Sequence, residues 1–95
     1  LALSINPNYA EAHNNLGAVY YSQGRNEDAF RELRAAVKLK ADDADAHNNL
    51  GTLYEMLGRV DDAIREYQTS LQIDPNHDAA RKNIERMDKM GGDRN

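Results

Sequence analysis

Asparagine side chains recur at one spacing along this sequence of 95 residues. Asn15, Asn49 and Asn83 follow one another at intervals of 34 residues, and Asn14 and Asn48 precede the first two. An asparagine amide offers one acceptor and two donors, so it can bond both the N–H and the C=O of an extended backbone. We therefore predict a column of amides that holds a peptide without reading its side chains. The alternative is that these amides only satisfy contacts between neighbouring helices.

Side chains near this column complete a predicted peptide-binding groove. Tyr21 is expected to face away from the core and to reach the groove. Lys82, Arg86 and Lys89 recur at helical spacing, which would make the groove basic at that end and suit a ligand with an acidic end. A solvated face of a terminal helix is the alternative. The predicted groove residues are Asn14, Asn15, Ala18, Tyr21, Asn48, Asn49, Thr52, Lys82, Asn83 and Arg86.

Residues that could support catalysis or bind a metal ion are few. His13 and His47 stand one repeat apart, and a metal or acid–base role is conceivable, but we expect them to pack between helices. The acidic clusters at 42–45 and 61–62 fall at predicted helix starts, where they complement the helix dipole. The chain has no cysteine and no phosphate-loop, nucleophile-elbow or zinc-protease motif. We therefore predict that it is not an enzyme and needs no cofactor or metal.

The charge balance restricts the class of partner. Twelve basic and 16 acidic residues give a net charge of −4, whereas nucleic acids and anionic membranes attract basic surfaces. No apolar run approaches the roughly 20 residues that a membrane-spanning helix needs. The start of the chain has neither a signal peptide nor a methionine, so we expect a part of a longer protein, with the cytoplasm as the default compartment.

A repeat of 34 residues must position these side chains. Residues 10–43 and 44–77 share 14 identical positions. Each copy predicts two helices; in the first, Ala12, Leu16, Val19 and Tyr20 follow the spacing of an apolar helix face. A glycine at positions 24 and 58 separates the two helices, and no alternating β-branched run predicts a strand.

The flanks divide the chain further. We predict the end of a truncated preceding repeat at 1–9, full repeats at 10–43 and 44–77, a capping helix at 78–90 and a disordered tail at 91–95. Pro7 and Pro75 lie between units, and Gly91-Gly92 is expected to end the last helix. Mid-helix Gly17 and Gly51 predict a close helix crossing, because glycine is otherwise unfavourable there.

The pattern resembles the tetratricopeptide repeat (TPR). The residues that carry the resemblance are Leu16-Gly17 and Leu50-Gly51, Tyr20 and Tyr54, Ala29 and Ala63, Leu33 and Tyr67, and Pro7 and Pro75. This sequence departs from the family pattern with His13 and His47 at a large aromatic position, Ala41 for a proline and Ser70 for an alanine. The resemblance implies an all-α, right-handed helix–turn–helix solenoid whose first helices line a concave groove for protein ligands.

The amide column is similar to the asparagine ladders of long repeat arrays attached to O-linked N-acetylglucosamine transferases, which hold substrate peptides. We therefore expect a protein–protein interaction scaffold that binds an extended peptide. The alternatives are a structural stacking or oligomerisation segment, and an accessory substrate-binding region of a glycosyltransferase. Asn14, Asp45 and Asn49 replace the basic residues of a chaperone-tail clamp, so we do not expect that mode. Exposed repeat ends predict self-association.

Overall fold

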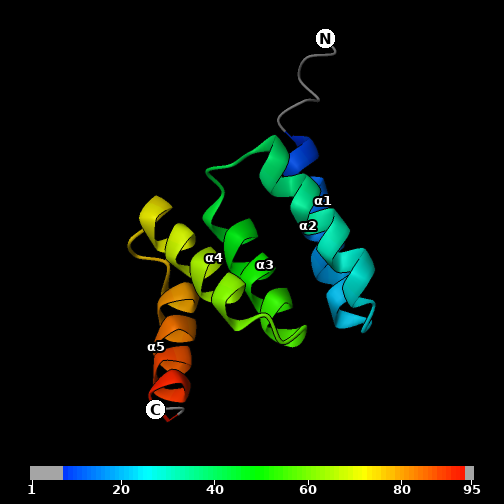
Figure 1. Ribbon diagram of the computed structural model, residues 1–95. Coiled ribbons are helices and arrows are strands. Elements are labelled where there is room, and N and C mark those ends of the chain that lie inside the picture. The colour runs from blue at the N-terminus through cyan, green and yellow to red at the C-terminus, as the bar shows by residue number, and fades with distance from the viewer. Residues whose placement is uncertain (1–7, 94–95) are drawn as a thin grey trace.

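A computed structural model describes residues 8–93, and every regular element within that range is a helix (Figure 1). The prediction of an all-α fold is therefore confirmed. The helices are α1 (Asn8–Ser22), α2 (Asn26–Leu39), α3 (Ala44–Met56), α4 (Val60–Ile73) and α5 (Asp78–Asp93). Most of the predicted end of a preceding repeat lies outside the described residues.

Helices α1 and α2 form one hairpin, α3 and α4 form the next, and α5 packs on α4 at the end of the stack (Figure 1). The principal extents are 56 × 29 × 17 Å, as expected for an elongated solenoid of stacked hairpins. None of the helices in residues 8–93 has both the length and the apolar character that crossing a membrane requires.

The same turn joins the two helices of each hairpin. Gly24 has φ 78° and Gly58 has φ 80°, in the left-handed region that side chains rarely adopt. After the first glycine, the N–H of Arg25 donates to the carbonyl of Tyr20 at 2.9 Å, and the Arg25 guanidinium lies 4.6 Å from the centroid of the Tyr20 ring. The second hairpin repeats both contacts, so the glycines predicted to break the helices do so with one geometry.

Close helix crossings explain the two mid-helix glycines. A Cβ atom at Gly17 would lie 2.7 Å from Cγ of Leu33, and one at Gly51 would lie 2.6 Å from Cε1 of Tyr67. The predicted crossing is present, but the side chains that fill it are Leu33 and Tyr67. At Gly17 the backbone oxygen of Ala29 also lies close, 3.3 Å from the Cβ position.

The core consists of two clusters that share a side chain. The first cluster is Ala29, Leu33, Leu50 and Leu53, and the second is Ala63, Tyr67 and Met87. Tyr54 packs against both clusters, and its ring meets Phe30 edge-on at a centroid distance of 5.2 Å. Each hairpin therefore packs its two helices on one another and buries further apolar side chains against the next unit.

The two ends of the stack differ in character. On α1, Leu16 is 40% exposed and Val19 is 48% exposed, whereas Leu50 and Leu53, at the same phase of α3, are buried under α2. At the other end, the exposed side chains among residues 78–89 of α5 are polar or charged apart from Ala79. The stack thus has one apolar end and one polar end.

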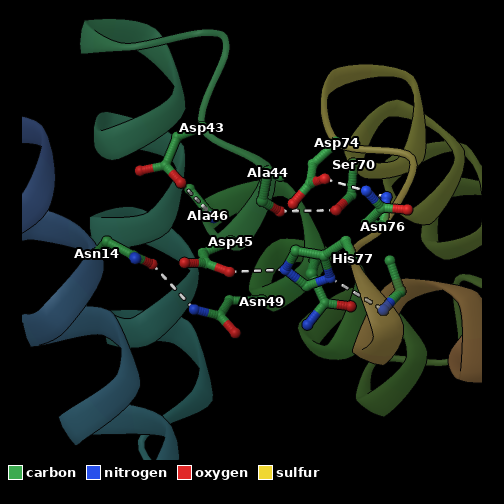
Figure 2. A network of polar contacts seen from close by, with 12 residues as sticks. Asn14, Asp43, Ala44, Asp45, Ala46, Asn49, Ser70, Asp74, Asn76 and His77 are labelled. Atoms are coloured by element: carbon green, nitrogen blue, oxygen red, sulfur yellow. Dashed lines mark hydrogen bonds and ion pairs between the residues drawn. The ribbon is translucent and has the colours of Figure 1, made fainter.

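Polar contacts link the N-terminal ends of α3 and α5 (Figure 2). Ser70 donates a hydrogen bond to the carbonyl of Ala44 at 2.8 Å. His77 Nδ1 accepts the N–H of Ala80 at 3.1 Å, so its other nitrogen carries the proton and donates to Asp45 at 2.6 Å. His77 therefore caps the start of α5 with its own side chain.

Helix α5 extends beyond its predicted end. The sequence predicted a stop before Gly91-Gly92, but the helix runs through both glycines to Asp93. Each glycine costs about 1 kcal/mol relative to alanine in a helix. The helix is already anchored on α4 through Ala80 and Met87, both buried, so two unfavourable residues do not end it.

Candidate functional site

The amides of successive repeats bond to one another. Nδ2 of Asn49 donates to Oδ1 of Asn14 at 3.0 Å, and Nδ2 of Asn83 donates to Oδ1 of Asn48 at the same distance (Figure 2 shows the first pair). The structure therefore brings four of the five predicted asparagines together in two pairs. Asn15, which no earlier helix covers within the described residues, is exposed.

These pairs use only part of each amide. Among the described residues, Asn49 makes one side-chain hydrogen bond, which leaves its carbonyl oxygen and one N–H for a ligand. Asn83 is more engaged, because its oxygen also accepts from Arg86 at 3.0 Å. The amides thus connect neighbouring repeats, and Asn49 keeps one donor and one acceptor. That the column holds a peptide stays a prediction.

Two adjoining depressions lie beside Asn49. The first, here called the α1–α3 hollow, has a volume of about 140 Å³ and is lined by Ala18, Tyr21, Leu33, Asn49 and Thr52. The second, the α3–α5 depression, has a volume of about 220 Å³ and is lined by Tyr21, Thr52, Glu55, Met56 and Arg86. They share Tyr21 and Thr52, so together they form a continuous groove across the first helices of the repeats.

Part of the predicted site lies in this groove. The predicted residues that line it are Ala18, Tyr21, Asn49, Thr52 and Arg86. Asn14, Asn48 and Asn83 lie behind or beside it as amide partners. Asn15 and Lys82 are exposed and line neither depression.

An ion pair closes the junction between α3 and α5. Arg86 makes two hydrogen bonds to the carboxylate of Glu55, one of them at 3.0 Å, and Tyr67 donates its hydroxyl to the same carboxylate at 2.8 Å. The hydrogen bond from Arg86, followed by that from Tyr67, lowers the pKa of Glu55 against the opposing effect of burial. The charge of Arg86 is therefore compensated by Glu55. Of the three residues predicted to make this end of the groove basic, Lys82, Arg86 and Lys89, the middle one adds no net positive charge there.

Tyr67 stays protonated in this arrangement. Desolvation by burial, together with the nearby Glu55 carboxylate, raises the pKa of Tyr67 to about 12. The hydrogen bond that Arg86 donates to the Glu55 carboxylate raises the pKa of Arg86 above its usual value. At neutral pH the junction thus contains one carboxylate, one guanidinium and one neutral phenol, with no net charge.

Sequence reasoning missed the contribution of the second helices to the groove. Leu33 and Tyr67 were not among the predicted groove residues. Leu33 nevertheless lines the hollow, and the buried Tyr67 donates its hydroxyl to Glu55, which lines the α3–α5 depression. A signal was present in Gly17 and Gly51, since a first helix without a side chain at that point lets a side chain from the second helix pass beneath it.

The histidines connect the two helices of each hairpin. Nδ1 of His13 lies 2.6 Å from a carboxylate oxygen of Glu32, and His47 makes the same contact with Glu66. Nε2 of His47 also lies 2.8 Å from the carbonyl oxygen of Ala41. Within residues 8–93, no three histidine, cysteine or acidic side chains are grouped closely enough to hold a metal ion.

Two family models match the sequence. One, described as TPR repeat, matches residues 2–24 and 19–58, and another, described as Tetratricopeptide repeat, matches residues 44–77. No curated protein sequence matches the chain significantly.

Solved structures resemble the chain closely. A crystal structure of MamA superposes with a TM-score of 0.83 at 30% identity, over 87% of this chain and 48% of that chain. A crystal structure of MamA protein gives 0.81 at 30% identity, over 87% and 45%. The chain thus spans about half the length of these two chains. The first TPR of Spaghetti (RPAP3), bound to HSP90 peptide SRMEEVD, gives 0.83 at 19% identity, over 90% and 68%.

Proposed function

This chain belongs to the tetratricopeptide repeat family, and we propose that it is a non-catalytic scaffold that binds an extended segment of another protein. The ligand would lie in the groove formed by the α1–α3 hollow and the α3–α5 depression. The observation that carries the proposal is the pairing of Asn49 with Asn14, which fixes the Asn49 amide at the edge of this groove with a donor and an acceptor to spare.

The repeat spacing suits an extended backbone. Packed helices lie about 8–10 Å apart, and an extended peptide advances about 3.3 Å per residue. One amide of the column would then meet the ligand at about every third residue. The similarity to asparagine ladders of the O-linked N-acetylglucosamine transferase type belongs to this proposal, as does the peptide seen on the first TPR of Spaghetti.

A random library of linear 12-residue peptides, displayed on phage, tests the proposal. The wild-type chain should enrich peptides, and Asn49→Ala should weaken their binding by about two- to tenfold for each hydrogen bond lost. Asn76→Ala, in the exposed turn before α5, is the matched control and should bind normally. Circular dichroism melts show whether each variant folds. An absence of enriched peptides, or full binding by a folded Asn49→Ala chain, contradicts the proposal.

Self-association is a second candidate function, favoured by the apolar end of the stack. Leu16 and Val19 are 40% and 48% exposed, while their counterparts on α3 are 3% and 0% exposed under a second helix. Because the other end is polar, two copies would meet symmetrically through α1 rather than head to tail. Sedimentation at high micromolar concentration should show a dimer, and Leu16→Asp should dissociate it. A wild-type chain that remains monomeric contradicts this proposal.

A further inference from the structure

The first helices of the successive units, α1, α3 and α5, meet at two junctions, and equivalent positions hold different residues at the two. At the α1–α3 junction the facing residues are Tyr21 and Thr52, and 34 residues later, at the α3–α5 junction, they are Glu55 and Arg86. The second junction is closed by the Glu55–Arg86 ion pair. The first has no such pair, and it is where the hollow of about 140 Å³ lies.

The side chain beneath each junction also differs: it is larger at the closed α3–α5 junction than at the open α1–α3 junction. Under Gly51, the ring of Tyr67 passes below α3, and its hydroxyl lies 2.8 Å from Glu55 and 3.4 Å from Thr52. Under Gly17, the equivalent side chain is Leu33, which lacks the outer part of a tyrosine ring. The chain fills one of two equivalent spaces with its own side chain and leaves the other open.

We infer that the α1–α3 hollow is an anchor site for one uncharged aliphatic side chain of the extended ligand, with the Asn49 amide bonding the ligand backbone beside it. This inference rests on the proposed function and adds a side-chain preference to it. The other junction, filled by Tyr67, shows which kind of group suits the space: a largely apolar one that enters between two first helices.

Size and charge both fit this occupant. An apolar cavity of about 150 Å³ holds a molecule as large as benzene, so the hollow has room for one branched aliphatic side chain. No carboxylate, ammonium, guanidinium or imidazole lines it. The two charged residues of the adjoining depression, Glu55 and Arg86, form an ion pair with one another, so a charged ligand side chain would lose its hydration without gaining an opposite charge.

Blocked amino acids test the hollow without requiring a known ligand. We would titrate the ¹⁵N-labelled chain with N-acetyl-leucine N-methylamide and follow the backbone resonances by NMR. Leu33, Asn49 and Thr52 should shift, and the apparent affinity should exceed that for the blocked glycine and blocked aspartate by about tenfold or more, as the burial of a leucine side chain predicts.

Two variants should abolish the response. Leu33→Tyr fills the hollow as Tyr67 fills its counterpart, and Ala18→Leu covers it from an exposed position, so the second variant remains informative if the first does not fold. Ala35→Leu lies in a separate shallow depression on α2 and should leave the response unchanged.

Equal shifts with all three compounds, no shifts at the hollow, or an unchanged response in folded Ala18→Leu would overturn the inference. Enrichment of peptides without any aliphatic preference would overturn the anchor while leaving the proposed groove. Failure of every peptide to bind, with the blocked leucine still entering the hollow, would instead count against the proposed function.

Discussion

The hydroxyl of Tyr67 lies 2.8 Å from the carboxylate of Glu55, and the Tyr67 ring reaches this position by passing directly beneath Gly51. A buried side chain from the core of one hairpin thereby holds a carboxylate that lines the α3–α5 depression. Arg86 completes the contact from α5, so three helices meet at one carboxylate. The core and the ligand-facing surface are consequently coupled at this point.

Substituting Gly51 with alanine should destabilise the chain. The new Cβ would lie 2.6 Å from Cε1 of Tyr67, which is fully buried, so the ring must move. Overpacking of this kind costs about 1–3 kcal/mol. Alanine is more favourable than glycine in a helix by about 1 kcal/mol, so the steric cost exceeds this gain when it lies in the upper part of its range. Urea denaturation should show a lower midpoint. In a double-mutant cycle, Gly51→Ala should cost less in a Tyr67→Ala background than in the wild type, because the truncated side chain leaves room for the new Cβ. An equal cost in both backgrounds would contradict the steric explanation.

Acid should weaken the contact between α3 and α5. The pKa of Glu55 is lowered from 4.5 in the folded chain, mainly by the hydrogen bond from Arg86. The stabilisation is therefore fully present above about pH 4.5 and is lost as the pH falls through the lowered value. Glu55→Gln should flatten the pH dependence of the unfolding free energy in this window. An identical slope in the two chains would show that Glu55 does not contribute.

High pH should destabilise the fold through ionisation of Tyr67. Burial raises its pKa from 10.0 to about 12, so the protonated phenol stabilises the fold below about pH 10, and this contribution is lost as the pH rises to about 12. In an absorbance titration at high pH, a late ionisation step at about pH 12 should appear, and Tyr67→Phe should remove it. A Tyr67→Phe curve that retains the late step would assign it to another residue.

The two histidines should contribute unequally to stability. The side chain of His47 is 13% exposed and has a second acceptor at Ala41, whereas that of His13 is 38% exposed. His47→Ala should therefore cost about 1–3 kcal/mol, as expected for the loss of two hydrogen bonds at about 0.5–1.5 kcal/mol each, and His13→Ala about 0–1 kcal/mol. Thermal melts of the two variants provide the comparison, and a larger loss at His13 would reverse this ranking.

The start of α3 offers a cap with a built-in control. Asp43 accepts the N–H of Ala46 at 3.2 Å through its side chain, while Asp42 is exposed in the preceding turn (Figure 2 shows Asp43 and Ala46). Asp43→Ala should cost about 1 kcal/mol and Asp42→Ala close to nothing. Chemical denaturation of both variants measures the difference. Equal losses would point to general charge effects at this helix end rather than to the cap.

Local patterns in the sequence were sufficient to predict the helices and their repeat. Apolar spacing defines each helix face, and Gly24 and Gly58 define the turns, because both depend on residues close in the chain. The amide pairing was not predictable in the same way. The residue 34 positions after Asn14 is Asn48, yet Asn14 accepts a hydrogen bond from the next residue, Asn49. The offset between stacked helices decides which amides meet.

The groove shows a similar division. Ala18, Tyr21, Asn49 and Thr52 were predicted as groove residues from helical spacing, and they line one hollow. Their binding of a peptide stays a prediction. The hollow itself depends on how far Leu33 reaches beneath α1, which is a matter of helix crossing and side-chain length in three dimensions. The ion pair of Arg86 with Glu55 likewise joins residues of different repeats, so no pattern within one helix could indicate it.

Tyr54 packs against both core clusters, one on each side of it. Loss of either hairpin would therefore remove one wall of the environment that keeps the other intact. Nearest-neighbour coupling of this kind makes units of a repeat array melt together rather than one by one. We expect a single cooperative transition, with cooperativity that depends on this one aromatic ring.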